Sequence, residues 1–322
     1  MGAPFYGSAQ RLKQDYAIHT VVKQRHTAVQ QLNTEVNMRW SPGGSSDDIE
    51  DRRSEGGGGG FRPGGMHIGL GGIIILLILS VVFKKNFFTL LDSGGGTGTG
   101  TTLSQPDPAQ DQKEKPLVDF VTYVLNDTQS TWTQVLSNEG VRYRHAKLVL
   151  FRDVTDSACG TAQSATGPFY CPEDEKVYID LGFYDELRRR FGAPGDFAQA
   201  YVLAHEIGHH VQKVLGVEEK VNEARARNPG AANQLSVRLE LQADCFAGIW
   251  GHSTQQRNIL ESGDVEEGLA AAAAVGDDRL QRMATGRVSP ESFTHGSSEQ
   301  RTHWFQTGYQ SGEISSCNTF QN

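Results

Sequence analysis

Cysteine is scarce in this chain of 322 residues, and its four cysteines lack the spacing of a metal cluster. No C-x-x-C motif occurs, which argues against a zinc ion held by cysteines. A basic run with interleaved aromatic residues is also missing from the C-terminal two thirds, where Arg188 to Arg190 is explained as a helix-end cluster. With a formal net charge of -8, the chain is not expected to bind nucleic acid.

A membrane span of full length is missing as well. Residues 68–83 carry no charge, but a span needs about 20 apolar residues. Lys84 and Lys85 can snorkel, and residues 87–91 can continue the apolar run at the interface. We therefore predict a single transmembrane segment at residues 68–91, with a buried core helix and a cleaved signal peptide as the alternatives.

The rest of the N-terminal third has too little apolar sequence to form a core. Residues 1–37 contain neither a targeting signal nor a folded unit, and we expect them to be a non-native extension before a translation start at Met38. Residues 38–67 and 92–115 are rich in glycine, threonine and charged residues, which predicts a flexible region and a linker. The folded domain is therefore expected at residues 116–322.

All four cysteines follow the predicted membrane segment. An even number in one compartment suggests disulfides and an oxidising exterior. Of the three possible pairings we prefer Cys159 with Cys171 and Cys245 with Cys317, and four reduced thiols are the alternative. The positive charges that flank the segment differ by only three to two. The cysteines therefore favour a single-pass protein of the bacterial cytoplasmic membrane whose domain is periplasmic or extracellular.

The most specific pattern is an H-E-x-x-H motif formed by His205, Glu206 and His209, in a segment predicted to be helical between Gly195 and Gly216. Two histidines four residues apart share one helix face and can bind one zinc ion, while the glutamate can take a proton from water on that metal. His210 lies about 140° from His205 around the helix, against about 40° for His209, so His210 is not a predicted ligand. A chance match is the alternative.

A second predicted helix, at residues 233–250, carries Glu240 and Asp244 on one face. A catalytic zinc takes three protein ligands, and a carboxylate from a second helix is one standard third ligand. Glu240 fits that role, and Asp244 can accept a hydrogen bond from the far nitrogen of a ligand histidine. Solvated surface charges are the alternative. The metzincin pattern fails, because Gln212 and Leu215 occupy its glycine and histidine positions.

The two motifs resemble the gluzincin arrangement of thermolysin-like enzymes. Further segments are similar to one bacterial family, the membrane-anchored neutral zinc metallopeptidases. They are Met38 to Trp40, Asp48 to Arg53, Gly167 to Pro172, Val177 to Leu181, the histidine motif, Arg238 to Gly248, and Thr294 to Gly296. The resemblance implies a peptidase with one catalytic zinc ion, and it implies no particular substrate.

The predicted fold class is α+β, a mainly helical zincin-like domain with a small sheet. Besides the two metal-binding helices, we predict helices at 116–136, 184–190, 265–275, 278–284 and 298–310, and strands at 147–151 and 176–181. By resemblance, residues 177–181 are placed at the sheet edge near the metal, where an extended substrate would pair with them. An ordinary core strand is the alternative.

The expected reaction is metal-assisted hydrolysis of a peptide bond. One Zn²⁺ held by His205, His209 and Glu240 would lower the pKa of its water ligand toward about 7. Glu206 would act as general base and then pass the proton to the leaving amine.

The reaction also needs a hydrogen-bond donor for the oxyanion of the tetrahedral intermediate. His295 is the best candidate, with Arg301 and Tyr178 behind it. The predicted partners are a peptide or protein substrate and a membrane. The alternative function is a non-catalytic periplasmic interaction protein whose zinc braces two helices.

Overall fold

The computed structural model describes residues 38–42, 44–55, 108–163, 167–191 and 195–321. None of the helices among them is long and apolar enough to span a membrane. The predicted extension at 1–37 and the predicted transmembrane segment at 68–91 lie outside the described residues.

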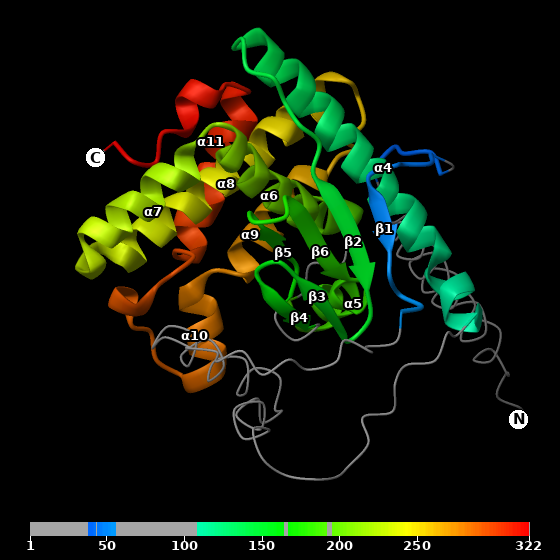
Figure 1. Ribbon diagram of the computed structural model, residues 1–322, viewed down its shortest axis with the longest axis horizontal. Coiled ribbons are helices and arrows are strands. Elements are labelled where there is room, and N and C mark those ends of the chain that lie inside the picture. Colours follow the sequence, from blue (N-terminus) through cyan, green and yellow to red (C-terminus); the bar gives the residue numbers. More distant parts are fainter. Residues whose placement is uncertain (1–37, 43, 56–107, 164–166, 192–194, 322) are drawn as a thin grey trace, which may run out of the picture.

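A mixed four-stranded sheet forms one layer of the fold (Figure 1). Its order is β1-β2-β6-β5, in which the first three strands are parallel and β5 is antiparallel to β6. The strands are β1 (Ile49–Asp51), β2 (Lys147–Phe151), β5 (Phe169–Cys171) and β6 (Lys176–Asp180), and a separate hairpin comprises β3 (Val154–Ser157) and β4 (Gly160–Gln163).

Both faces of β2 and β6 are covered, as expected of central strands. Side chains alternate between the two faces of a strand. Leu148 and Ile179 belong to the main core with the helices, whereas Val149 and Tyr178 belong to a smaller cluster on the other face. The alternation therefore divides the interior of the domain into two cores.

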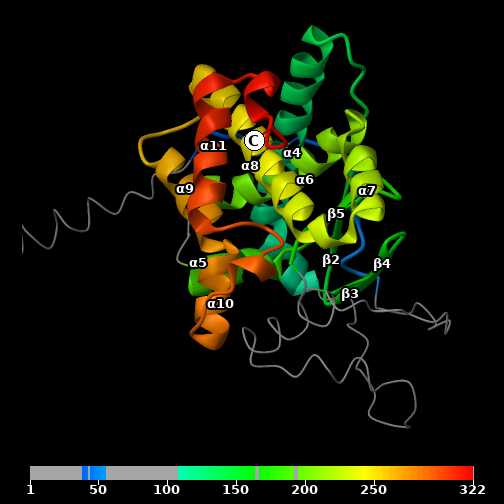
Figure 2. The same cartoon turned by 90° about the vertical axis from the view of Figure 1, so that its left-hand side faces the viewer.

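Helices form the larger part of the domain. α6 packs against β5 and α8, and α8 packs in turn against α11 (Figures 1 and 2). The helices are α4 (Pro108–Asn138), α5 (Gly182–Phe191), α6 (Asp196–Val214), α7 (Val217–Arg227), α8 (Ala232–Gln256), α9 (Asp264–Ala274), α10 (Asp277–Thr285) and α11 (Ser298–Ser311). The prediction of a mainly helical α+β domain is confirmed.

The folded domain begins earlier than the sequence predicted. Met38 lies in the main core, and the ring of Trp40 packs edge-on against Phe120 with the centroids 5.2 Å apart. Residues 49–51 form β1, and residues 108–115 of the predicted linker form the first turns of α4. The predicted flexible region at 38–67 and linker at 92–115 are therefore wrong for residues 38–55 and 108–115, whereas residues 56–67 and 92–107 lie outside the described residues.

The prediction that residues 177–181 form an edge strand is also wrong. β6 pairs with β2 on one side and with β5 on the other, so β1 and β5 are the edges of the sheet. The alternative reading, a core strand, describes β6.

Two disulfides close the fold. Cys159, in the turn of the β3–β4 hairpin, is bonded to Cys171 at the end of β5. Cys245 in α8 is bonded to Cys317 in the C-terminal segment. The structure thus contains the preferred pairing, and none of its described cysteines is free.

Candidate metal centre

α6 is a buried helix that approaches α8 closely. Gly195 caps its start and Asp196 lies in its first turn, where a negative charge favours the helix dipole. Gly216, with a φ of 66°, follows its end. At the crossing, a Cβ atom on Gly208 would lie only 2.9 Å from the carbonyl oxygen of Ala243 in α8. The glycine therefore lets α6 and α8 come together.

This crossing gathers the three predicted ligands. His205, His209 and Glu240 each offer one ligand atom, and these atoms all lie within 4.8 Å of one another. Nε2 of His205 lies 3.2 Å from Oε2 of Glu240, and Nε2 of His209 lies 3.6 Å from Oε1 of the same carboxylate. The side chains are 8%, 16% and 19% exposed, so the cluster is mostly shielded but reachable.

Asp244 supports His205, as predicted from its spacing. Its side chain is fully buried, and Oδ1 lies 2.9 Å from Nδ1 of His205. Arg301 donates to both carboxylate oxygens at 2.8 and 2.9 Å, and the hydroxyl of Tyr201 donates to Oδ1 as well. Burial alone would raise the pKa of Asp244, but Arg301 and His205 lower it, so the group is a carboxylate.

Gln212 supports His209 in a similar position. Its Oε1 lies 2.9 Å from Nδ1 of His209. With both Nδ1 atoms engaged, the two Nε2 atoms are the ones that face Glu240.

This donor set fits a zinc ion. Two imidazole nitrogens and one carboxylate oxygen form a standard catalytic zinc set, and each histidine has the outer partner that orients it. The charges agree with this conclusion. Burial lowers the pKa of His205, but Asp244 and Glu240 together raise it to about 10. Burial raises the pKa of Glu240, yet the nearby histidines bring it well below its usual value. The carboxylates thus create a site that favours positive charge.

Glu206 lies beside the ligands with a mostly buried side chain. Among the described residues no hydrogen bond to its carboxylate is found, so it can accept a proton from a water molecule at the site. The hydroxyl of Tyr184 in α5 is buried and has no hydrogen-bond partner among the described residues, and both burial and the charge of Glu206 raise its pKa.

His210 has a structural environment. Its Nε2 lies 2.6 Å from the carbonyl oxygen of Arg144, and its Nδ1 lies 2.9 Å from the hydroxyl of Tyr170. These contacts hold it away from the ligand cluster and agree with its exclusion from the predicted ligands.

The three candidate oxyanion donors lie in different places. The side chain of His295 is 44% exposed, and the charges of Glu240 and Asp277 raise its pKa against the lowering effect of desolvation. Arg301 is buried and engaged by Asp244, and Tyr178 lies in the small core with its hydroxyl 2.8 Å from a carboxylate oxygen of Asp174. The predictions of Arg301 and Tyr178 as donors are wrong.

Sequence reasoning missed three supporting residues. Tyr201 lies four residues before His205, and Gln212 lies three residues after His209, so both share the helix face of a ligand. That spacing was the available signal. Arg301 comes from a separate helix, and no pattern in the sequence connects it with Asp244.

A family model described as "Putative neutral zinc metallopeptidase" matches residues 38–320. The chain is 48% identical over 286 residues to the uncharacterized protein YpfJ of Escherichia coli K12, covering 88% of this chain and 99% of YpfJ. It is 43% identical over 206 residues to the uncharacterized protein Rv2575 of Mycobacterium tuberculosis H37Rv, covering 61% of this chain and 68% of that protein. No solved structure matches the chain.

Proposed function

This chain belongs to the Putative neutral zinc metallopeptidase family, as its motifs predicted, and we propose that it is a zinc-dependent peptidase. One observation carries the proposal. The nitrogen atoms of His205 and His209 and a carboxylate oxygen of Glu240 lie within 4.8 Å of one another. The carboxylate of Glu206 interacts electrostatically with His209 and has no hydrogen-bond partner among the described residues. A zinc site that only braced two helices would have no use for Glu206.

When bound, a zinc ion in such a site lowers the pKa of a water molecule toward about 7 and polarises the carbonyl of the substrate. His205, His209 and Glu240 are the residues that would hold it. Glu206 accepts a proton from the attacking water and passes it to the leaving amine. His295 can donate to the oxyanion from Nε2, because Asp277 and Thr294 contact its other ring nitrogen.

The sheet edge offers a place for an extended peptide or protein substrate. β5 is an edge strand and packs against α6, the helix that carries both histidine ligands. A substrate strand can pair with the backbone of such an edge without the need for particular side chains. We therefore propose β5, in place of β6, as the strand that positions the substrate.

The two disulfides support a location in an oxidising compartment, the periplasm or the cell exterior. We also propose that residues 68–91 attach the chain to a membrane, but the fold argues against a single crossing. β1 precedes this stretch and α4 follows it, yet Arg53 and Glu114 are 2.7 Å apart. A single crossing would put these residues on opposite sides of the membrane, so we propose that both ends of the stretch lie on one side.

Labelling of intact cells with an impermeant maleimide tests this topology. Cysteines replacing the exposed Ser54 and Ser137 should react equally, because the two positions flank the apolar stretch within one folded unit. Labelling of only one of them would support the single crossing.

The proposed activity is tested on the purified full-length protein by measuring zinc content and cleavage of a mixed peptide library. Wild type should bind about one zinc ion and cleave, Glu206→Gln should bind zinc without cleaving, and Glu240→Ala should lose zinc. Glu219→Gln, the same change at an exposed position of α7, is the control and should behave as wild type. If zinc binds but wild type cleaves nothing and Glu206→Gln changes nothing, the zinc-braced interaction protein is the better description.

A further inference from the structure

Gln212 connects a metal ligand to the interior of the domain. It is only 1% exposed, and each end of its side-chain amide has a partner. Oε1 lies 2.9 Å from Nδ1 of His209, while Nε2 donates to the carbonyl oxygen of Leu239 at 2.7 Å and to Oε1 of Gln242 at 3.2 Å. This amide is therefore fixed between the two helices that supply the zinc ligands.

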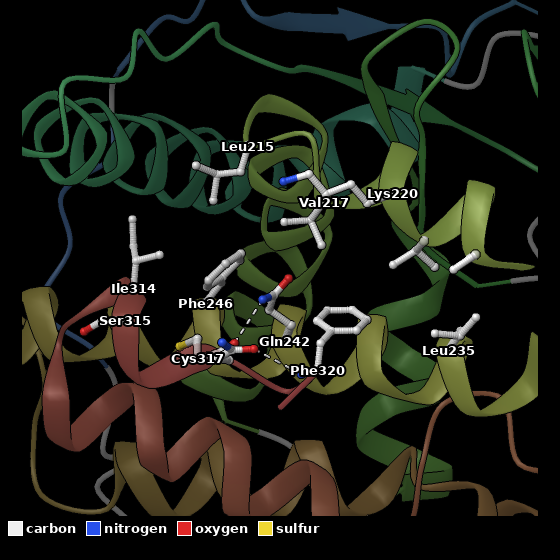
Figure 3. Close-up of a pocket in the computed structure, with 13 residues that line it drawn as sticks. Leu215, Val217, Lys220, Leu235, Gln242, Phe246, Ile314, Ser315, Cys317 and Phe320 are labelled. Carbon is white, nitrogen blue, oxygen red and sulfur yellow. Dashed lines mark hydrogen bonds between the residues drawn. The ribbon is translucent and has the colours of Figure 1, made fainter. Parts of the chain in front are cut away.

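Gln242 continues the connection toward the C-terminal segment. Its Nε2 donates to the carbonyl oxygen of Cys317 at 3.0 Å, and Cys317 is bonded to Cys245 in α8. Figure 3 shows the amide of Gln242 and the segment at Cys317 together in the wall of a cavity of about 460 Å³ between α7, α8 and the C-terminal segment. The connection thus runs from His209 through two glutamines to a residue held by a disulfide.

The orientation of both amides follows from the chemistry of their partners. A backbone carbonyl oxygen can only accept a hydrogen bond, so the nitrogen of Gln212 must face Leu239 and the nitrogen of Gln242 must face Cys317. The oxygen of Gln212 is then left to face His209, where it can only accept. Nδ1 of His209 must therefore carry a hydrogen, and the lone pair of its neutral ring lies on Nε2.

That tautomer is the one a metal site requires. Nε2 of His209 faces Glu240, and a neutral imidazole binds zinc through the nitrogen that carries no hydrogen. A side chain that could not accept from Nδ1 would leave the ring free to rotate and to exchange tautomers.

We propose that Gln212 is the positioning residue of the zinc ligand His209 and that Gln242 and the Cys317 carbonyl hold it in place. The proposal rests on the proposed zinc site. In it, the uncharged Gln212 orients His209 as the charged Asp244 orients His205. Outer partners of this kind affect metal affinity by about 10- to 100-fold.

The test compares the zinc dissociation constant and the thermal stability of the metal-free protein in three variants of the full-length chain. Gln212→Met removes both functions of the amide, and we expect zinc to bind about 10- to 100-fold more weakly. Gln212→Glu keeps an oxygen for His209 but cannot donate to Leu239. It should therefore lower stability while its zinc affinity stays close to that of wild type.

Gln129→Met is the matched control. Gln129 is also 1% exposed and is bonded to the backbone of Ala146 in both directions, but it lies on α4, away from the ligands. This variant should lose stability and keep its zinc affinity. If Gln212→Met does not fold, Gln242→Met removes the next member of the connection and should weaken zinc binding in the same direction.

Unchanged zinc affinity in Gln212→Met would overturn the proposal. So would a loss of affinity in Gln212→Glu as large as that in Gln212→Met, because a purely structural role would not distinguish an accepting side chain from an apolar one. A wild-type protein that binds no zinc would instead overturn the proposed function, so the two failures can be told apart.

Discussion

Gly208→Ala should separate the stability of the fold from the geometry of the metal centre. The added Cβ would lie 2.9 Å from the carbonyl oxygen of Ala243 and 3.1 Å from its Cα, where ordinary contact begins at 3.4 Å. The two nearest atoms to the added Cβ belong to the backbone of α8 and cannot rotate away. The two helices, α6 and α8, must therefore move apart by about 0.5 Å. Zinc ligands tolerate deviations of only about 0.2 Å. Because Glu240 lies on α8 and both histidines lie on α6, this movement should lower zinc affinity at least about tenfold.

The effect of this substitution on stability is expected to be small, because two terms oppose each other. Overpacking costs about 1–3 kcal/mol, and replacing glycine by alanine in a helix interior gains about 1 kcal/mol. The free energy of unfolding of the metal-free protein should therefore fall by no more than about 2 kcal/mol. Zinc affinity is measured by competition with a chelator, and stability by denaturant unfolding in the presence of EDTA.

Gly251→Ala is the matched control in α8. The nearest atoms to its Cβ would belong to side chains and not to backbone, namely Tyr309 at 3.3 Å, Phe197 of α6 at 3.4 Å and Phe305 at 3.7 Å, and Gly251 lies about two helical turns beyond Ala243 in α8. We expect zinc affinity close to that of wild type. If Gly208→Ala binds zinc as tightly as Gly251→Ala, the close approach of the two helices does not control the metal geometry, and the reasoning is refuted.

Two further predictions concern charged groups. Arg301→Met should lower the free energy of unfolding by about 3–5 kcal/mol, because it leaves the carboxylate of Asp244 buried without its guanidinium partner. Denaturant unfolding measures this change, and a loss of less than about 1 kcal/mol would contradict the prediction. Burial and a neighbouring aspartate raise the pKa of Glu267 to about 7, so its ionisation destabilises the fold increasingly as pH rises from about 4.5 to 7. Glu267→Gln should therefore raise the melting temperature at pH 8 and leave it unchanged at pH 4; equal shifts at both pH values would exclude this explanation.

The elements that sequence alone predicted well are those whose signals are local. The two histidines of the motif are four residues apart, which is close to the 3.6-residue period of a helix. The helix around them begins at Asp196 and ends at Val214, close to its predicted limits. The strand at 147–151 has the predicted bounds, because a short apolar run is enough to mark it. Spacing also predicted that Asp244 would support a ligand, since one helical turn separates it from Glu240.

The failures share a different cause, which is dependence on distant partners. β1 has three residues and becomes a strand only because it pairs with residues 148–150, almost a hundred positions later. The prediction for Tyr178 failed for the same reason. The face of the sheet on which its ring lies depends on how β6 pairs with its neighbouring strands, which are distant in sequence or unmarked by it. The glycine-rich and charged composition of the N-terminal region likewise indicated a flexible segment and gave no sign of its contacts with α4, which include the ion pair of Arg53 and Glu114.

The support of the metal ligands depends on the same kind of distant contact. Asp244 is held by Arg301 from α11, and Gln212 is held through Gln242 by the carbonyl of Cys317. All three ligands lie between residues 205 and 240, yet both of their supports are completed by residues 301–317. We therefore expect both histidines to be held in the orientation for zinc binding only after the C-terminal part of the chain has packed on α8. The disulfide between Cys245, the residue after Asp244, and Cys317 joins the C-terminal segment covalently to α8 and so stabilises that packing.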